Sequence, residues 1–324
     1  MTVQERTEHD GGAGGLTVFS WIDQQHQFLD ETYDHLLVAQ DRKPISRCLY
    51  LAHKIQHTCE HHAVGLLAGL QLNRNARYQY VKELYAAVLC ELMGRKAGIA
   101  PPTRLLLICA ALTQDIGMLD LQEDRLDKQP SGLSESQLRQ VQRHPLNGLK
   151  ILKRVGVIDP LWLQVVAQHH ERLDGSGYPL ELNSDKISQA SRILTVVDSY
   201  VAMSRPRGDR AALLPRNAMA QIFQSKGAEI DAPLAKSLIS LLGTHPPGSW
   251  IELANDEIAV VVKPGVSLAF PVVGSVISPT GEHLDQAILR DTSEPAFTMI
   301  EMVKAPFHFS LASVLAQLWP KILD

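Results

Sequence analysis

Hydrophobic residues recur at the spacing of an α-helix along most of this chain, with no strand-like alternation before about residue 242. A Gly-rich leader over residues 1–15 precedes the pattern, and Pro and Gly breaks divide it into successive helices. We predict an N-terminal helical unit over residues 16–76 and a larger helical domain over residues 77–243.

The pattern changes after residue 243, where β-branched residues gather in short runs. Three such runs occupy residues 250–253, 257–263 and 271–277. Turn signals at Asn255-Asp256 and Pro264-Gly265 separate them. We predict a small antiparallel β-unit over residues 244–324, with a short amphipathic helix near residues 309–322. The fold class is therefore mainly α, and the β-unit is expected to pack against the helices rather than to bind a ligand.

Composition narrows the range of partners. With 31 Lys and Arg against 35 Asp and Glu, the formal net charge of −4 excludes the basic surface that DNA or RNA requires, although a small nucleotide needs only a few cations. No apolar run approaches the roughly 18 residues of a membrane span. Four cysteines lack metal-binding or disulfide spacing, so we expect a cytoplasmic protein with no membrane contact.

Two acids stand in apolar helical surroundings, Asp115 and Asp198. A carboxylate buried there costs several kcal/mol unless it is paired, hydrogen-bonded or bound to a metal. Three histidines, His144, His169 and His170, accompany them, and imidazole together with carboxylate suits iron, manganese or zinc. The residues favour a buried metal centre. Two simpler interpretations stay open, in which His144 begins a helix and Asp198 is a core acid bonded to Arg or Tyr.

A second group of histidines lies at helical spacing in residues 51–62. His53, His57 and His61 share one face, with Cys59 and Glu60 nearby, and two such histidines can chelate a metal. Because no second ligand-bearing segment is evident, we favour a solvated polar face here.

The string from His169 to Pro179 matches the HHExxDGxGYP motif of the HD-GYP family without a substitution. Gln114-Asp115 and the HPxxG segment from His144 to Gly148 precede it in family order, and Asp198 follows. Over about residues 77–242 the chain therefore resembles this family. The resemblance implies an HD-superfamily helical bundle that holds two or three ions, usually iron or manganese, and hydrolyses cyclic di-GMP with a metal-bridging hydroxide.

The departures from the family pattern fall on one side of the implied site. Gln114 stands where the family has a histidine, Met118 where it has a lysine, and Lys82 and Tyr78 align with an upstream histidine and glutamate. What remains is the complete shell of one ion, whose residues are Asp115, His144, His169 and His170. The other ion keeps only Asp115 and Asp198, so we predict one divalent ion rather than two or three. We hypothesise that the Lys82 ammonium replaces the missing cation and neutralises Asp198.

The resemblance also assigns roles. Asp115, His169 and His170 would act in catalysis, and substrate contacts would come from Arg207, Arg210, Gly177, Tyr178 and Pro179. The two arginines could equally be solvated loop residues. The Tyr-Pro loop is also implicated in docking a GGDEF-type domain. Since two-metal hydrolysis relies on both ions, we predict either a weak cyclic di-GMP phosphodiesterase, or a silent module that binds a nucleotide or a partner. Hydrolysis of a different phosphate ester is a third possibility.

Overall fold

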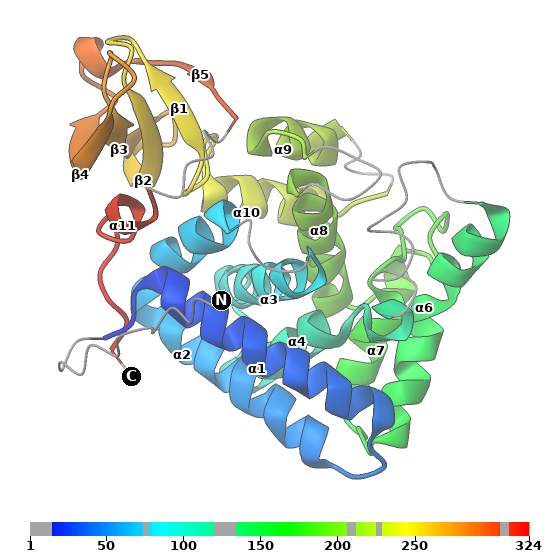
Figure 1. Ribbon diagram of the computed structural model, residues 1–324. Helices are drawn as coiled ribbons and strands as arrows, with labels where there is room; N and C mark the ends of the chain where they lie inside the picture. Colours follow the sequence, from blue (N-terminus) through cyan, green and yellow to red (C-terminus); the bar gives the residue numbers. More distant parts are fainter. Residues whose placement is uncertain are drawn as a thin grey trace.

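The computed structural model describes residues 15–73, 78–119, 134–205, 212–224, 229–304 and 311–323. Helices form most of it, as predicted, and a small antiparallel sheet follows them (Figure 1). The helices are α1 (Val18–Val38), α2 (Lys43–Leu72), α3 (Tyr78–Lys96), α4 (Pro101–Thr113), α6 (Glu135–Arg154), α7 (Pro160–Gln168), α8 (Gln189–Ser204), α9 (Pro215–Gln224), α10 (Ala232–Leu242) and α11 (Ala312–Leu315), with 3-10 turns η1 (Ile116–Met118), η3 (Ser184–Lys186) and η4 (Pro295–Phe297).

Short polar residues begin several of these helices. The Ser134 hydroxyl accepts a hydrogen bond from the Gln137 N–H, and the Gln137 side chain accepts one from the Ser134 N–H, which completes a capping box on α6. Asp159 caps α7 and Ser188 caps α8 by a simpler contact, in which the side-chain oxygen accepts hydrogen bonds from backbone N–H groups of the first turn. These local signals set where the helices that carry the histidines and Asp198 begin.

One apolar core joins the helices. It contains Leu29 of α1, Leu66 of α2, Val88 of α3, Leu112 of α4 and Val197 of α8, each fully buried. The N-terminal helices α1 and α2 thus pack on α3 and share its core. The domain boundaries at residues 76 and 243 stay predictions.

The sheet has the strand order β4-β3-β2-β1-β5, and every neighbouring pair is antiparallel. Its strands are β1 (Trp250–Leu253), β2 (Ile258–Ser267), β3 (Phe270–Ile277), β4 (His283–Asp291) and β5 (Met299–Met302). Alternate residues of β2 face opposite sides, so Val260 and Val262 join the helical core while Ala259 and Val261 join a second small core within the β-unit.

Three details differ from the predictions. Pro264-Gly265 lies inside β2 rather than at a turn, and the pairing of β2 with β3 shifts register between Lys263 and Ser267, which accommodates a residue that has no N–H to donate. Strands β4 and β5 were not predicted, because neither contains a run of β-branched residues. Within the described part of residues 309–322, the α-helix is only the short α11.

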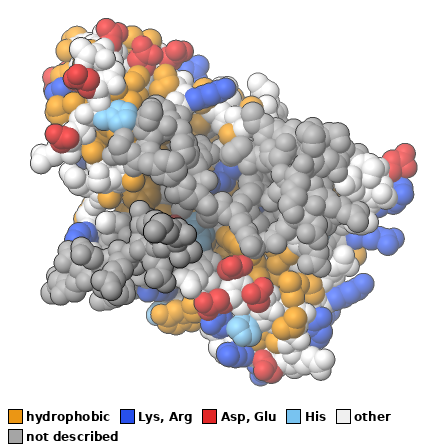
Figure 2. Space-filling model, in the orientation of Figure 1, with side chains coloured by type: hydrophobic (Ala, Val, Ile, Leu, Met, Phe, Trp, Pro, Cys, Tyr) orange, Lys and Arg blue, Asp and Glu red, His pale blue; other side chains and the backbone are white. Residues whose placement is uncertain are grey.

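The four cysteines are buried and unpaired. None of the described helices has both the length and the apolar character needed to cross a bilayer. Figure 2 shows hydrophobic side chains at the surface of the β-unit, at the upper left, interspersed with acidic ones.

Candidate metal centre

Asp115 lies where α4 gives way to the 3-10 turn η1. Its neighbour Gly117 rests directly on α6, since a Cβ atom there would stand 2.2 Å from the His144 carbonyl oxygen and 2.5 Å from the Gly148 nitrogen. No side chain fits at that distance, so a glycine is required for η1 to contact α6. This close packing brings the fully buried Asp115 carboxylate beside His144.

His144 occupies the middle of α6 and is followed by Pro145. Proline has no N–H, so the Val141 carbonyl loses its usual helical donor. The His144 ring takes that place, with its Nδ1 2.5 Å from the Val141 oxygen. Donation from Nδ1 leaves Nε2 as the acceptor that faces the interior, which is the tautomer that binds metal. His144 is therefore not at the start of a helix, as the simpler interpretation had it.

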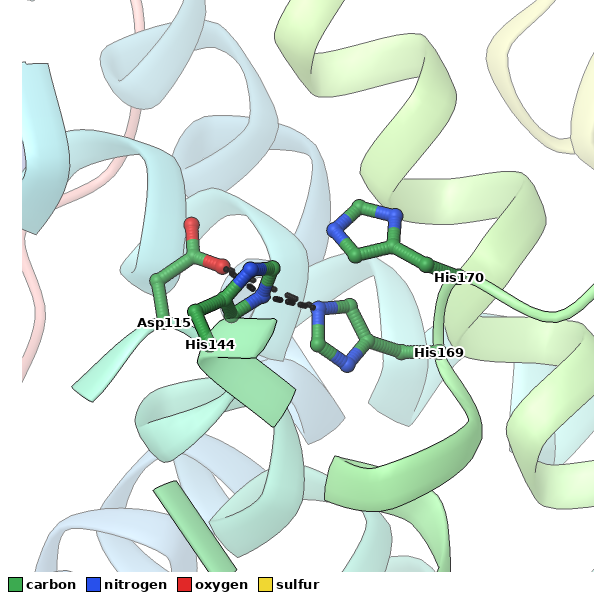
Figure 3. Close-up of side chains that lie close together, drawn as sticks. All are labelled: Asp115, His144, His169 and His170. Atoms are coloured by element: carbon green, nitrogen blue, oxygen red, sulfur yellow. Dashed lines mark hydrogen bonds and ion pairs between the residues drawn. The ribbon is translucent and has the colours of Figure 1, made fainter. Parts of the chain in front are cut away.

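His169 obtains the same tautomer from the end of a helix. It is the C-terminal capping residue of α7. Its Nδ1 lies 2.8 Å from the Val166 carbonyl oxygen, which is one of the carbonyls that a helix end leaves without an N–H partner. Its Nε2 then faces the Nε2 of His144 at 3.1 Å (Figure 3). Two facing nitrogens without protons repel each other unless a proton or a cation lies between them.

The distances within this cluster fit a shared ion. Asp115 Oδ1 lies 3.2 Å from His144 Nε2 and 3.7 Å from His169 Nε2. Ligand atoms that bind one ion at roughly 2.1 Å stand about 3–3.5 Å from one another. With His170, the four residues offer ligand atoms that all lie within 4.8 Å, and they are the one such group among the described residues.

The charge states of the cluster also suit a cation. Burial lowers the pKa of His144 and holds the pKa of His170 well below its usual value, where His169 and His144 add to the effect. Burial alone would raise the pKa of Asp115, but the neighbouring Lys82 ammonium holds it well below its usual range. Neutral imidazoles beside an ionised carboxylate are the protonation states that metal ligands need.

Tyr178 covers the cluster from the loop after α7. Its ring stacks on His170 with centroids 4.7 Å apart, and its N–H donates to the His170 carbonyl at 3.2 Å. Gly177 permits the close return of the loop, because a Cβ atom there would stand 2.4 Å from the Arg172 nitrogen. The predicted loop residues Gly177, Tyr178 and Pro179 thus lie beside the four metal-competent residues.

Glu171 holds this loop in place and was missed from the sequence as a site residue. It is buried, and its two carboxylate oxygens accept hydrogen bonds from the N–H groups of Leu180 at 2.7 Å and Leu182 at 2.8 Å. Because Glu171 follows His170 directly, one carboxylate fixes the loop onto the histidine pair. Glu171 is the glutamate of the HHE segment, and this position was the sequence signal that could have identified it as a site residue.

Lys82 of α3 lies on the opposite side of Asp115 and is almost completely buried. Its Nζ contacts Asp115 Oδ2 and lies 2.8 Å from Asp198 Oδ1 on α8. Within the described part of the chain, Asp198 thus pairs with a lysine rather than with Arg or Tyr. It stands outside the four-residue group, with Oδ2 4.0 Å from His170 Nδ1.

Gln114 lies on the same side of Asp115 as Lys82, and its Nε2 donates a hydrogen bond to Glu83 Oε2 at 2.7 Å. Both residues are fully buried. Burial and the nearby Asp115 carboxylate raise the pKa of Glu83 well above its usual value. Glu83 therefore also belongs to this side, although nothing in the sequence pattern distinguished it.

The remaining predicted residues divide into three groups. Met118 is half-buried in η1. Arg207, Arg210 and the side chain of Tyr78 lie outside the described residues. His53, His57 and His61 are exposed on α2, as the solvated interpretation predicts.

The profile of the HD domain family matches residues 55–234, more than half of the sequence. The chain belongs to the HD domain family. It is 27% identical over 224 residues to a cyclic di-GMP phosphodiesterase of Pseudomonas aeruginosa, covering 69% of this chain and 54% of that protein. It is 36% identical over 160 residues to a 3'3'-cGAMP-specific phosphodiesterase of Vibrio cholerae, covering 49% of this chain and 34% of that protein.

Both relatives are therefore longer, and the chain spans about half the length of the first and a third of the second. Among solved structures, an HDG"Y"P protein from Bdellovibrio bacteriovorus matches with a TM-score of 0.58 at 15% identity, covering 72% of this chain and 74% of that one. At that identity the likeness shows the fold, an HD-type helical bundle. These matches confirm the predicted family and the mainly α fold.

Proposed function

We propose that this chain is a cyclic dinucleotide signalling protein of HD-GYP type, with a metal-dependent phosphodiesterase site of weak or lost activity and one bound ion. The observation that carries the proposal is the convergence of Asp115, His144, His169 and His170 within 4.8 Å. The names of the Pseudomonas and Vibrio relatives support cyclic di-GMP or 3'3'-cGAMP as the ligand.

The divalent ion, iron or manganese, would be held by these four residues, and when bound it would acidify a water and polarise a phosphodiester. The chain itself supplies the two Nε2 acceptors, fixed by the Val141 and Val166 carbonyls, and the carboxylate of Asp115. Tyr178 limits access of bulk water to His170 by stacking on it. Asp115, His169 and His170 are the residues we assign to catalysis if it occurs.

Lys82 supports the reduction to one ion. Its ammonium lies between Asp115 and Asp198, where a second cation would share the same two carboxylates. An ammonium neutralises carboxylates but cannot activate water as a metal does. We therefore assign Asp198 an assisting role through Lys82, and expect any turnover to be slow.

The alternative is a catalytically silent module that binds a nucleotide or a GGDEF-type domain. The rigid surface formed by Gly177, Tyr178 and Pro179 supports this alternative, because Glu171 holds that loop independently of the Gln114 and Lys82 side. In either case Arg207 and Arg210 would contact ligand phosphates. We place the protein in the cytoplasm without a DNA, RNA or membrane partner, a setting that the four free buried cysteines suit.

Two measurements on the purified chain test the proposal. Metal analysis should give one tightly held ion per chain, lost in His169→Ala and kept in His53→Ala, an exposed histidine on α2. Two or more ions would contradict the one-ion assignment. Incubation with cyclic di-GMP or 3'3'-cGAMP and Mn²⁺ should give slow product that disappears in His169→Ala.

Binding of either nucleotide without turnover would favour the silent module. The assignment to cyclic dinucleotide signalling would be overturned if the chain neither bound nor hydrolysed either of the two nucleotides. Activity on a general phosphodiester alone would indicate a different phosphate ester as substrate.

A further inference from the structure

The N-terminal helix α1 reaches the segment that carries Asp115. Tyr33 of α1 is buried, and its hydroxyl donates a hydrogen bond to the Leu112 carbonyl at 2.5 Å. Leu112 lies in the last turn of α4, where a helix end leaves carbonyls in need of donors from elsewhere. Asp115 follows three residues later in the chain. Tyr33 therefore holds the stretch of backbone from which the shared carboxylate extends.

The same tyrosine also contacts the helix that carries Lys82. The Tyr33 ring packs against the ring of Tyr80, with centroids 5.5 Å apart and planes tilted by 39°. Tyr80 is buried on α3, two residues before Lys82, and its hydroxyl donates to Asp30 of α1. Helix α1 thus contacts both α3 and α4. The relative position of these two helices decides how closely the Lys82 ammonium approaches the Asp115 carboxylate.

A second hydrogen bond joins the end of α4 to the helix that presents His169. Trp162 Nε1 donates to Thr113 Oγ1 at 2.9 Å, and both side chains are buried. Trp162 lies on α7, whose C-terminal capping residue is His169. The end of α4 is therefore held from two directions, by α7 through Thr113 and by α1 through Leu112. The α7 contact lies within the segment matched to the HD domain family, residues 55–234, whereas α1 precedes that segment.

We propose that Tyr33 is a positioning residue of the metal centre, and that α1 is a working part of this centre although it lies outside the matched family segment. The inference rests on the proposed metal site and names an element that adjusts it. Loss of the Tyr33 hydroxyl would release the end of α4, so the distances from Asp115 Oδ1 to His144 and His169 would no longer be fixed. Any displacement of α1 would reach the metal centre through the same contact.

Tyr33→Phe tests this role, because phenylalanine keeps the ring beside Tyr80 and removes only the hydroxyl. We expect the Mn²⁺ affinity of the full chain, measured by calorimetric titration, to fall by about tenfold or more, as for other groups that orient metal ligands. The visible absorption bands of bound Co²⁺ should also change, since they report the ligand geometry at the ion. A residue that only stabilises the fold would alter neither property in the folded protein.

Thr292→Val is the matched control. The Thr292 hydroxyl is buried in the β-unit and donates to the Pro271 carbonyl at 2.7 Å, so this variant also removes one buried donor from a backbone carbonyl. It should keep the wild-type Mn²⁺ affinity and Co²⁺ spectrum. Thermal unfolding verifies that each variant is folded at the temperature of the titration.

Tyr80→Phe provides the second arm, because it removes a hydrogen bond between α3 and α1 and leaves Tyr33 intact. We expect a smaller fall in Mn²⁺ affinity in the same direction. Unchanged affinity and Co²⁺ spectrum in a folded Tyr33→Phe variant would overturn the role of Tyr33 and leave the metal site standing. If Tyr33→Phe does not fold, unchanged affinity in Tyr80→Phe would overturn the role of α1. Absence of Mn²⁺ binding by the wild-type chain would instead contradict the metal site itself, and this inference with it.

Discussion

The two carboxylate oxygens of Asp115 face opposite environments. Oδ1 lies toward the Nε2 atoms of His144 and His169, and Oδ2 contacts the ammonium of Lys82. Every group on the first side is an acceptor that can bind a cation. The second side already contains a cation that is part of the chain, the ammonium of Lys82. One buried carboxylate thus shows two solutions to the same electrostatic problem, an exchangeable ion and a fixed one.

The difference has a consequence for stability and for chemistry. A tethered ammonium stabilises the fold in every solution condition below its own pKa, whereas a metal stabilises only when it is available. A metal can also act on a bound water, which a lysine cannot do. The Lys82 side therefore favours structure, and the histidine side keeps the capacity for chemistry.

Removal of the fixed cation should produce the largest effect. Lys82→Met leaves Asp115 and Asp198 buried without their ammonium, which should lower the free energy of unfolding by about 3–5 kcal/mol. Chemical denaturation measures this change. Lys96→Met, on an exposed lysine of the same helix, should change it by less than about 1 kcal/mol.

The same side can be rebuilt as a metal site. Lys82→His combined with Gln114→His places two imidazoles beside Asp115 and Asp198, and we expect the number of bound ions to rise from one to two per chain. Metal analysis of the single and double variants gives the answer. An unchanged ion count in a folded double variant would show that Lys82 does not occupy a cation position.

Loss of an imidazole on the histidine side of Asp115 should lower the affinity for metal and leave the metal-free fold intact. His144→Ala should lower metal affinity by more than about a hundredfold, since even residues that only orient ligands contribute ten- to a hundredfold. Calorimetric titration with Mn²⁺ measures this affinity. The same affinity in wild type and His144→Ala would place the ion elsewhere.

Substitution of Glu171 tests whether the loop after α7 orients the histidine pair His169 and His170. In Glu171→Gln one amide oxygen can still accept from Leu180 or Leu182, but the amide NH₂ faces the other N–H, which should cost up to about 3 kcal/mol. We expect a weaker Mn²⁺ affinity as well, because His170 is stacked on this loop. Glu301→Gln, an exposed glutamate of β5, is the control, and a change in stability without a change in affinity would limit Glu171 to a structural role.

His26 provides a contrast to the histidines of the cluster. It is buried on α1, and neither ring nitrogen has a hydrogen-bond partner in the described part of the chain. Burial, with a contribution from Arg205, lowers its pKa to about 4 from a usual value of 6.5. The unfolded chain takes up a proton below pH 6.5, and the folded chain resists it until about pH 4, so stability falls as the pH falls between these values.

At pH 5 this loss should amount to about 2 kcal/mol relative to pH 7.5. His26→Phe should reduce the dependence by that amount, and His53→Phe, at an exposed position, should not. Urea denaturation at the two pH values measures the difference. Equal pH dependence in wild type and His26→Phe would show that another group controls it.

The sequence predicted the helical fold and the β-unit from local signals, and the four metal-competent residues from their match to the motifs of the HD-GYP family. Pro145 after His144, Gly117 in the turn after Asp115 and Gly177 in the loop are residues whose backbone requirements can be recognised along the chain. The pairing of Lys82 with Asp198 was only a hypothesis, and the contacts of Gln114 with Glu83 and of Glu171 with its loop were not predicted at all. Each of these joins segments that helical periodicity does not relate.

The sequence by itself determined which residue types can bind a cation and which local turns present them. The tertiary structure alone decided that α3, α4 and α8 converge so that one ammonium meets two carboxylates. The physical reason is that dihedral preferences act over a few residues, whereas the partner of a buried charge depends on how distant helices pack into the least costly arrangement of charge and apolar surface.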